Sequence, residues 1–550
     1  MARNHSYAQL DDSGSLELES LVSSSNSPSR GSVSSRGLSD EPPPVFDEND
    51  DGDRSHLRVP GASRARSFSV STIGEHMFPL AASSDMAAIT SGVPLEKQKS
   101  LNVFHGLGLV IGLQIGSGIF ASPSQVNSHA GSVGGSLIIW IVAGLLAWTG
   151  ASAFAELGST IPLNGAAQAY LNHIFGAFPS FLFSWTALTV LKPGSAAIIS
   201  IIFSEYFTRG LGESSFLASY WVQKLFALVG LGLVTGINIF STRLGANASG
   251  VFLVVKICVL LSITVIGLVA LPNLRHQGAL AQNSLFEGTA KSFGDYAIAL
   301  YAGLWAYDGW DNVNYVAAEM KNPARDIPRV IHTAMPVVII AYVLANLSYY
   351  LVLTQEEILG STTVTLTYMN KIFGKIGGIV FSLLIAITCL GSLNATIFSS
   401  ARLAYAAAED GFLPQVFSDI SPKRGTPVNA LLLQSAMTSL FILVGEFHTL
   451  LTFYGVAGFT FYFLTVFGVI VLRFKDPDLD RPYKTYLATP ILFCCVALFL
   501  ISRTVFEKPL ESLIAIAFML AGCPIYLYRF GLHSFDFKEL INRSKGWLRL

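Results

Sequence analysis

Charged residues are scarce in this chain of 550 residues. Only 13% of the residues are charged, 51% are hydrophobic, and the formal net charge is −1. This composition is too apolar for a soluble domain and is typical of an integral membrane protein. Because binding to DNA or RNA requires a basic surface, the near-zero net charge argues against a nucleic-acid partner.

Cysteine and the common catalytic motifs are also rare or missing. No cysteines are spaced like zinc ligands, and the sequence contains neither a His-Glu-x-x-His motif nor a Walker loop. We therefore expect no metal site, no cofactor, no enzyme activity and no ATP-driven pump. Residues 1–14 are polar and lack the apolar core of a signal peptide. The cysteines all lie within apolar runs, where we expect small apolar side chains without disulfides: Cys258, Cys389, Cys494, Cys495 and Cys523.

Apolar runs of the length that crosses a bilayer as a helix, about 20 residues, recur between residues 101 and 530. Since every backbone polar group must be paired inside lipid, these runs predict helices rather than strands. A kink is expected at Pro193-Gly194 in the third run. We predict an all-α integral membrane protein with twelve transmembrane helices, near residues 101–128, 134–158, 178–207, 221–240, 247–271, 293–318, 329–353, 376–408, 427–445, 448–472, 486–505 and 510–530.

The two ends of the chain differ from this membrane domain of residues 98–530. Residues 1–97 are rich in Ser, Gly, Pro and charge, and are predicted to form a disordered cytosolic tail. Ser67 follows two arginines and resembles a basophilic kinase site, although a solvated linker is the favoured interpretation of such a serine. Residues 531–550 are predicted to form a cytosolic tail with a possible interfacial helix. The distribution of Lys and Arg places both termini in the cytosol, with Arg503 and Lys508 outside.

Two of the predicted membrane helices contain helix breakers at their centres. The first run contains Gly112, Gly116 and Gly118, and the sixth contains Asp308-Gly309. Each glycine weakens a helix by about 1 kcal/mol. One explanation is structural: the Gly-x-x-x-Gly spacing of Gly112 and Gly116 would simply allow two helices to pack closely. Breaks at matching positions in two halves of the chain instead favour an inverted-repeat transporter with its site at the breaks.

The breaks would supply the groups that bind a zwitterion. An unwound segment leaves backbone N–H and C=O groups free near the middle of the bilayer. Helix N-termini attract a carboxylate, and free carbonyls accept hydrogen bonds from an ammonium group. An amino acid carries both groups, so the predicted substrate is a small-molecule amino acid.

These breaks are part of a wider resemblance to the L-type amino acid transporter family, the light-chain group of the amino acid–polyamine–organocation superfamily. The long N-terminal tail is more similar to fungal members, including the methionine permease group, than to animal members. The resemblance implies a five-plus-five inverted repeat with broken helices 1 and 6, followed by two further helices. It extends over residues 98–530 and rests on the segments 115–120, 155–158, 304–310, 319–323 and 391–394.

The resemblance also implies roles for individual residues. The backbone at the first break would hold the carboxylate of the substrate and assist with its amine, and carbonyls at the second break would bind the amine. Trp305 corresponds to an aromatic gate over the substrate. The implied substrate-binding set is Gln114, Ile115, Gly116, Ser117, Gly118, Ile119, Trp305, Ala306 and Asp308.

Two lysines lie deep in predicted membrane helices, where a charge is costly and usually functional. In sodium-independent relatives, a lysine at the position of Lys256 takes the place of a sodium ion, so the resemblance implies sodium-independent transport. The alternative is a structural lysine bonded to carbonyls of the broken first helix. We interpret Lys192 as structural, because it could satisfy the carbonyl that Pro193 frees.

Asp308 bears on the choice of substrate. In the family, an aspartate in this Tyr-Asp-Gly-Trp setting occurs in members that accept cystine and dibasic amino acids, whereas many large-neutral transporters have glycine. A carboxylate would pair with a cationic side chain. Asp308 could instead cap the second half of helix 6, a part that Asp311 could also play.

Several alternatives concern partners and location. Animal light chains bond to a heavy chain through a cysteine between helices 3 and 4, but residues 209–220 contain none, so no covalent heavy-chain partner is expected. The predicted partners are the amino acid and membrane lipid.

We expect the protein to lie in the plasma membrane, with the vacuolar membrane as the alternative. The sequence is compatible with two transport mechanisms, exchange of amino acids and symport with protons. The alternative function is an amino acid sensor that uses the same site with little or no transport.

Overall fold

The computed structural model describes residue 99 and residues 101–212, 214–217, 219–274, 278–282, 284–421, 424–444 and 447–531. Within these ranges every named element is a helix, and a single isolated β-bridge joins Leu101 to Met320. The predicted tail of residues 1–97, the Ser67 site and residues 532–550 lie outside the described part. The expectations for them stay predictions.

The helices follow one another along the chain with short connections. A π-helical turn, Ala187–Leu191, directly precedes α8, close to the kink that the sequence predicts at Pro193. A 3₁₀ helix, η2, spans Asn312–Glu319, and another, η3, spans Gln415–Ser418. The α-helices are α2 (Val103–Gln114), α3 (Ser117–Ala121), α4 (Pro123–Ala130), α5 (Val133–Thr160), α6 (Ala167–Phe175), α7 (Ala177–Thr186), α8 (Lys192–Leu211), α9 (Tyr220–Phe240), α10 (Thr242–Leu274), α11 (Ala279–Gln282), α12 (Phe293–Ala306), α13 (Pro323–Val352), α14 (Gln355–Leu359), α15 (Val364–Glu409), α16 (Val428–Val444), α17 (Phe447–Lys475), α18 (Ala488–Glu507), α19 (Pro509–Leu520) and α20 (Gly522–Phe530).

The prediction of an all-α, multi-pass membrane protein is confirmed. The shorter helices α12 and α16, with 14 and 17 residues, occupy the sixth and ninth predicted runs, and the count of twelve spans stays a prediction. Within the described part of the chain, ten helical segments are long and apolar enough to cross a membrane: Val103–Ala121, Val133–Thr160, Ala177–Leu211, Tyr220–Phe240, Ala248–Ala270, Pro323–Val352, Val364–Glu409, Gly455–Lys475, Ala488–Glu507 and Pro509–Phe530.

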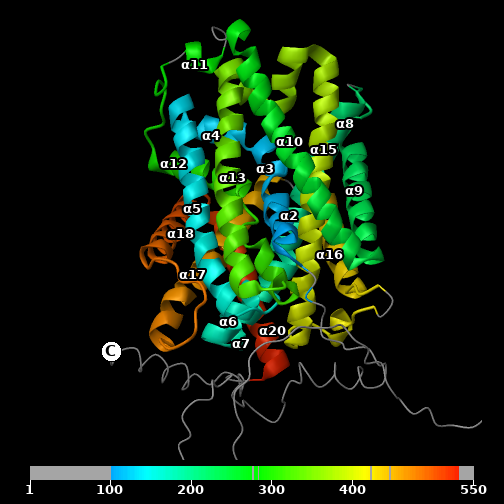
Figure 1. Ribbon diagram of the computed structural model, residues 1–550, viewed down its shortest axis with the longest axis vertical. Coiled ribbons are helices and arrows are strands. Elements are labelled where there is room, and N and C mark those ends of the chain that lie inside the picture. The colour runs from blue at the N-terminus through cyan, green and yellow to red at the C-terminus, as the bar shows by residue number, and fades with distance from the viewer. Residues whose placement is uncertain are drawn as a thin grey trace, which may run out of the picture. The chain divides into compact units, whose positions relative to one another are not determined.

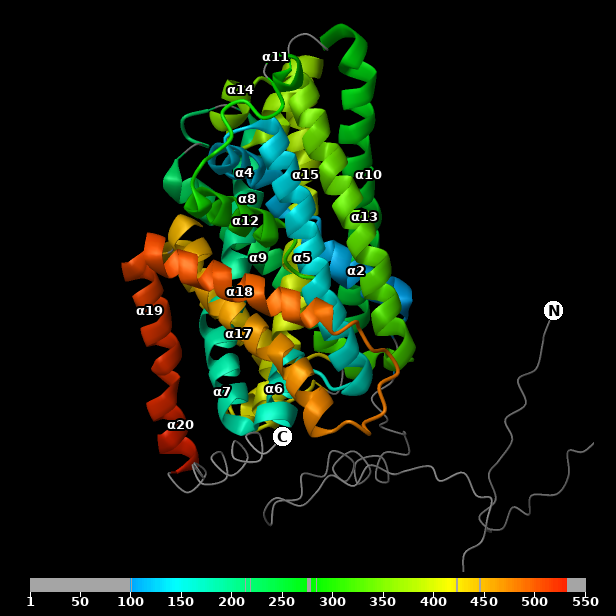
Figure 2. The ribbon, with the colours of Figure 1, turned by 90° about the vertical axis from the view of Figure 1, so that its left-hand side faces the viewer.

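The broken first helix lies inside the bundle. Helix α2 packs against α10, α13 and α15, and α5 packs along α13 (Figure 1). Helices α17 and α18 pack against each other on another side of the bundle, where α18 also contacts α12 (Figure 2). Large apolar side chains such as Val251, Leu261 and Val269 of α10 are exposed, as expected for a surface that faces lipid.

Candidate functional site

The first predicted break is present in the structure. Helix α2 ends at Gln114, and Ile115 leaves the helical conformation with φ −75° and ψ 85°. Gly116 is also non-helical, with φ −146° and ψ −132°, and α3 begins at Ser117. The segment is buried, so the backbone groups that the break frees lie inside the protein.

The second predicted break lies in the sixth run. Helix α12 ends at Ala306, the chain turns through residues 307–311, and η2 begins at Asn312. Gly309 has φ +103°, a conformation that side-chain-bearing residues rarely adopt. A Cβ at Gly309 would also lie 2.5 Å from Cγ of Leu113, so glycine permits both the turn and its contact with α2.

The two breaks touch each other. A Cβ built on Gly118 would lie 2.5 Å from Cα of Ala306, so the backbones of α3 and α12 meet here because residue 118 has no side chain. Gln114 spans the same contact, since its Nε2 donates to the Tyr307 carbonyl at 2.9 Å. The structure thus brings together residues of the predicted set from both breaks.

Tyr342 of α13 bridges the two breaks. Its hydroxyl donates toward two carbonyl oxygens that the breaks free, that of Gln114 and that of Ala306, the latter at 3.1 Å. The residue is fully buried. Sequence reasoning missed Tyr342, because a tyrosine within a long apolar helix has no local pattern that shows what its hydroxyl contacts.

Lys256 lies where the sequence expectation places it, beside the first break. It is fully buried on α10, and its ammonium donates to the Gly112 carbonyl and to Oγ of Ser392 at 2.6 Å. Ser392 of α15 in turn donates to the Gly112 carbonyl at 3.0 Å. A Cβ on Gly116 would lie 2.0 Å from the same serine oxygen. Lys256 and Ser392 therefore connect α10 and α15 to the end of α2.

Asp308 and Asp311 share a partner on α17. The Tyr462 hydroxyl lies 3.1 Å from Oδ1 of Asp308 and 3.4 Å from Oδ2 of Asp311. Asp311 is buried and holds the N-cap position of η2, but its side chain makes no capping bond. Asp308 lies earlier in the turn and is not the cap, so the capping interpretation of Asp308 is wrong.

Lys192 is placed differently from the expectation that it satisfies a carbonyl near Pro193. Its ammonium lies over the ring of Tyr315, 4.1 Å from the ring centroid. Asp311 lies close enough for charge attraction by Lys192. The ammonium group of Lys192, over an aromatic ring and beside a buried carboxylate, links α8 to η2. This is a contact between segments far apart in the sequence rather than a contact within α8.

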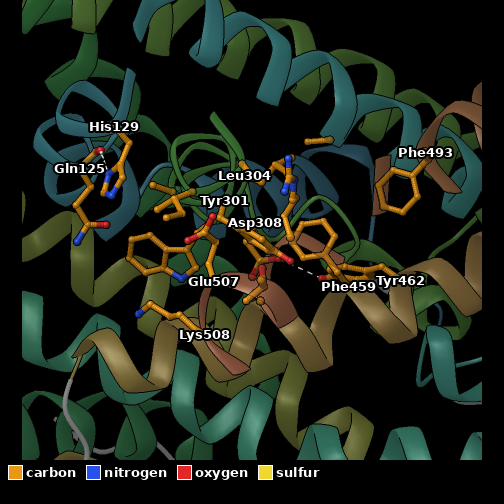
Figure 3. A pocket seen from close by; sticks show the side chains of 18 of the residues that line it. Gln125, His129, Tyr301, Leu304, Asp308, Phe459, Tyr462, Phe493, Glu507 and Lys508 are labelled. Carbon is orange, nitrogen blue, oxygen red and sulfur yellow. Dashed lines mark hydrogen bonds between the residues drawn. The ribbon is translucent and has the colours of Figure 1, made fainter. Parts of the chain in front are cut away.

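A cavity of about 410 Å³ adjoins the second break (Figure 3). Residues from α4, α5, α12, α17 and α18 line it. Of the predicted set, Trp305 and Asp308 contribute to the lining, whereas residues 114–119 do not. Trp305 is only 9% exposed. The cavity thus reaches the predicted gate and Asp308 from one side and does not extend to the first break.

Comparison with known proteins identifies the family. Residues 101–527 match the family model described as amino acid permease. The chain belongs to this family. The mouse b(0,+)-type amino acid transporter 1 is 38% identical over 449 residues, which cover 81% of this chain and 91% of the relative. Its human counterpart is 36% identical over 443 residues, covering 79% and 89% of the two chains.

A second group of relatives carries a different name. The mouse large neutral amino acids transporter small subunit 2 is 34% identical over 444 residues, which cover 81% of this chain and 83% of the relative. The resemblance to L-type, light-chain amino acid transporters is therefore confirmed. The range that matches the family model, residues 101–527, covers nearly all of the membrane part, including the positions of both breaks and of Lys256.

Proposed function

We propose that this protein is a sodium-independent secondary transporter that carries amino acids across a membrane by alternating access. The observation that supports this most directly is the contact between the two breaks, where Gly118 lies against Ala306. It brings an N-terminal half-helix end and freed carbonyls to one place, as binding of a zwitterion requires. Membership of the amino acid permease family supports the same function.

The predicted site residues take the following roles in this proposal. Backbone N–H groups at the start of α3, including those of Ser117, Gly118 and Ile119, bind the substrate carboxylate. Carbonyls at the end of α12, around Trp305 and Ala306, bind the ammonium group. Tyr342 contacts the Ala306 carbonyl and that of Gln114, so it holds the two breaks in register. Trp305 acts as the gate between this site and the cavity beside it.

Lys256 takes the place of a sodium ion in this mechanism. The Gly112 carbonyl and the Ser392 hydroxyl around its ammonium are oxygen ligands of the kind that hold hard cations. A fixed ammonium supplies positive charge at the end of α2 without an ion from solution. Transport would therefore proceed without sodium.

The substrate range follows from the relatives and from Asp308. One group of relatives is named for large neutral amino acids, and we propose neutral substrates such as leucine or methionine. Asp308 lines the cavity and adds a carboxylate that can pair with a cationic side chain. We therefore propose that cationic amino acids are accepted as well.

The relatives named small subunit 2 raise the question of a partner chain. Residues 209–220 of this chain contain no cysteine, and we propose that no covalent heavy chain is attached. The protein is an integral, multi-pass membrane protein, and we place it in the plasma membrane with both termini in the cytosol. The relatives are named as transporters, which supports a transporter rather than an enzyme.

Uptake into sodium-free proteoliposomes tests the proposal. Labelled methionine, leucine and arginine are offered to vesicles with and without unlabelled amino acid inside. Uptake that depends on internal substrate indicates exchange, and uptake into empty vesicles that increases with an inward proton gradient indicates symport. Binding to the purified protein without any uptake would contradict transport and favour the sensor function.

A further inference from the structure

Four exposed cations gather at the start of α13. Lys321 precedes the helix, and Arg325 and Arg329 lie one turn apart on the same side of it. Lys99 joins them because the carbonyl of Leu101 accepts from the Lys321 N–H at 2.9 Å, and two residues of chain span at most about 7 Å. We call these four cations, Lys99, Lys321, Arg325 and Arg329, the basic cluster.

Little negative charge opposes the basic cluster. Arg325 lies 3.3 Å from Asp326, but the arginine side chain is 62% exposed, so solvent screens this pair. The neighbouring carboxylate of Glu319 already pairs with Arg402 at 3.4 Å, and both of these side chains are largely buried. Within the described part of the chain, the other members of the cluster form no ion pair. The cluster therefore presents an excess of positive charge to its surroundings.

The side of α13 that carries the two arginines continues as an apolar, exposed surface. Ile340 lies about three helical turns beyond Arg329 and so faces the same way. Ile340 is exposed, as are Val337 and Leu344. Helix α13 lies along an edge of the bundle beside α10, as Figure 2 shows. Exposed aliphatic side chains at this edge suit contact with the acyl chains of lipids.

The length of α13 places the arginines near the surface of the bilayer. The helix has 30 residues and is about 45 Å long, whereas the hydrocarbon layer is about 30 Å thick. When centred, it extends about 7 Å, or about five residues, beyond the hydrocarbon at each end. Arg325 lies within that stretch. Arg329 lies about 3 Å inside the hydrocarbon edge, from which its long side chain reaches the headgroups.

We propose that the basic cluster binds the headgroup of an anionic phospholipid in the cytosolic leaflet, with the acyl chains along the exposed apolar side of α13. Guanidinium groups bind phosphate oxygens in a bidentate manner, and the cytosolic leaflet is the one rich in anionic lipid. The choice of leaflet rests on the topology in the proposed function, whereas binding itself does not depend on transport. Since α13 also carries Tyr342, the lipid anchors the helix that contacts both breaks.

A lipid fits this surface better than a soluble anion or an acidic peptide. The acidic residues within 47–53 of the same chain could be attracted to the cluster by charge alone. Neither a free phosphate nor that segment would also use the apolar side chains of Val337, Ile340 and Leu344. Only an anionic lipid matches the cations and the adjoining apolar surface together.

Thermal unfolding of the full chain in detergent tests the site. Phosphatidylserine or phosphatidylcholine with the same acyl chains is added, so that only the headgroup differs. For the wild type, we expect an unfolding temperature higher by about 2–5 °C with phosphatidylserine, because a ligand of the folded state stabilises it. The difference should shrink at about 0.5 M salt, which screens exposed charges.

Two variants with equal loss of charge show where the lipid binds. Lys321→Gln/Arg329→Gln removes two cations that form no ion pair with described residues, and it should lose at least half of the difference between the lipids. Lys291→Gln/Lys475→Gln removes two exposed lysines near the start of α12 and at the end of α17, and it should keep the whole difference. Each variant is compared with itself in the two lipids, so a general loss of stability does not affect the result.

Several outcomes would overturn the site. Equal unfolding temperatures of the wild type in the two lipids would do so, as would equal losses in the two double variants. The same increase with soluble glycerophosphoserine would show that the cluster binds a free anion. A full-length variant with the acidic residues within 47–53 changed to amides gives a further control. A response to phosphatidylserine in this variant alone would assign the cluster to that segment. Failure of uptake would contradict transport without changing these results.

Discussion

Gly118 and Ala306 meet so closely that a Cβ on Gly118 would lie 2.5 Å from the Ala306 Cα. This contact joins the start of α3 to the end of α12, two segments far apart in the sequence. Because the neighbouring atom belongs to the backbone, a side chain at position 118 cannot be accommodated by a change of rotamer. The distance between the two breaks therefore depends on this glycine.

The first prediction concerns this contact. Gly118→Ala should separate α3 from α12 at a cost of about 1–3 kcal/mol and reduce the uptake rate by about tenfold or more. Gly112→Ala is the matched control, since a Cβ on Gly112 would meet no atom within 4 Å beyond its own helix. Uptake by both variants in proteoliposomes provides the comparison. Equal activities would show that the contact between the breaks is not needed.

Lys256 provides the second prediction. Lys256→Ala should fold, because Ser392 still donates to the Gly112 carbonyl at 3.0 Å, but it should lose transport for lack of the fixed charge. Uptake is measured with and without sodium. Lys291→Ala, which removes an exposed lysine near the start of α12, is the control. Full activity of Lys256→Ala would refute its role in transport.

Asp308 provides the third prediction, which concerns substrate choice. Asp308→Gly should weaken arginine uptake by about tenfold or more, because a charge-assisted hydrogen bond contributes about 1.5–3 kcal/mol, and should leave methionine uptake much less affected. Asp311→Asn is the comparison, since Asp311 shares Tyr462 but does not line the cavity. If arginine and methionine uptake are both unchanged in Asp308→Gly, the residue does not select substrates.

The fourth prediction concerns a buried ion pair between α5 and α17. Glu156 accepts from Arg473 Nε at 2.9 Å and from Nη2 at 2.5 Å, and it also accepts from the Thr485 N–H at 2.9 Å. Arg481 lies 3.8 Å away. Glu156→Gln leaves Arg473 buried without its carboxylate, which should cost about 3–5 kcal/mol of stability.

Thermal unfolding in detergent measures this loss. Glu205→Gln is the control, because Glu205 pairs with Arg209 at 2.9 Å in a more exposed ion pair that contributes little. A small change of stability in Glu156→Gln, similar to that in Glu205→Gln, would show that this cluster does not hold α5 to α17.

The fifth prediction concerns pH and Asp410, which follows the last residue of α15. Burial raises the pKa of Asp410 above its ordinary value of 3.8, although hydrogen bonds from Gln168 at 2.7 Å and from Asn172 at 3.3 Å oppose the shift. Because the pKa of Asp410 is raised in the folded state, the contribution of this residue to stability is greatest below pH 3.8 and is lost as the pH rises through the folded-state pKa.

Asp410→Asn should remove this loss. The variant should unfold at a temperature higher by about 1–3 °C at pH 8, and the difference should shrink as the pH falls toward 4. The new amide can also donate to Oε1 of Gln168, which has no hydrogen-bond partner among the described residues. Asp478→Asn, at an exposed position, is the control. A lower unfolding temperature for Asp410→Asn at pH 8 would contradict the prediction.

The sequence by itself determined the class of protein and the places where its membrane helices break. Both are local properties: an apolar run must be long enough to cross a bilayer, and glycines weaken a helix wherever they occur. The breaks around Gly116 and Asp308 therefore lie where the pattern predicts. The deep position of Lys256 was equally visible, since it follows from the length of the run on either side.

Only the tertiary structure decided what these residues contact. Tyr342 bridges both breaks, Ser392 supports Lys256, and Lys192 lies over Tyr315. The capping interpretation of Asp308 was wrong because the turn after α12 continues to Asp311 before η2 begins. Each of these contacts joins residues from different helices, and their partners depend on how the helices pack. A pattern along the chain specifies which face of a helix is apolar, but not which neighbour that face meets.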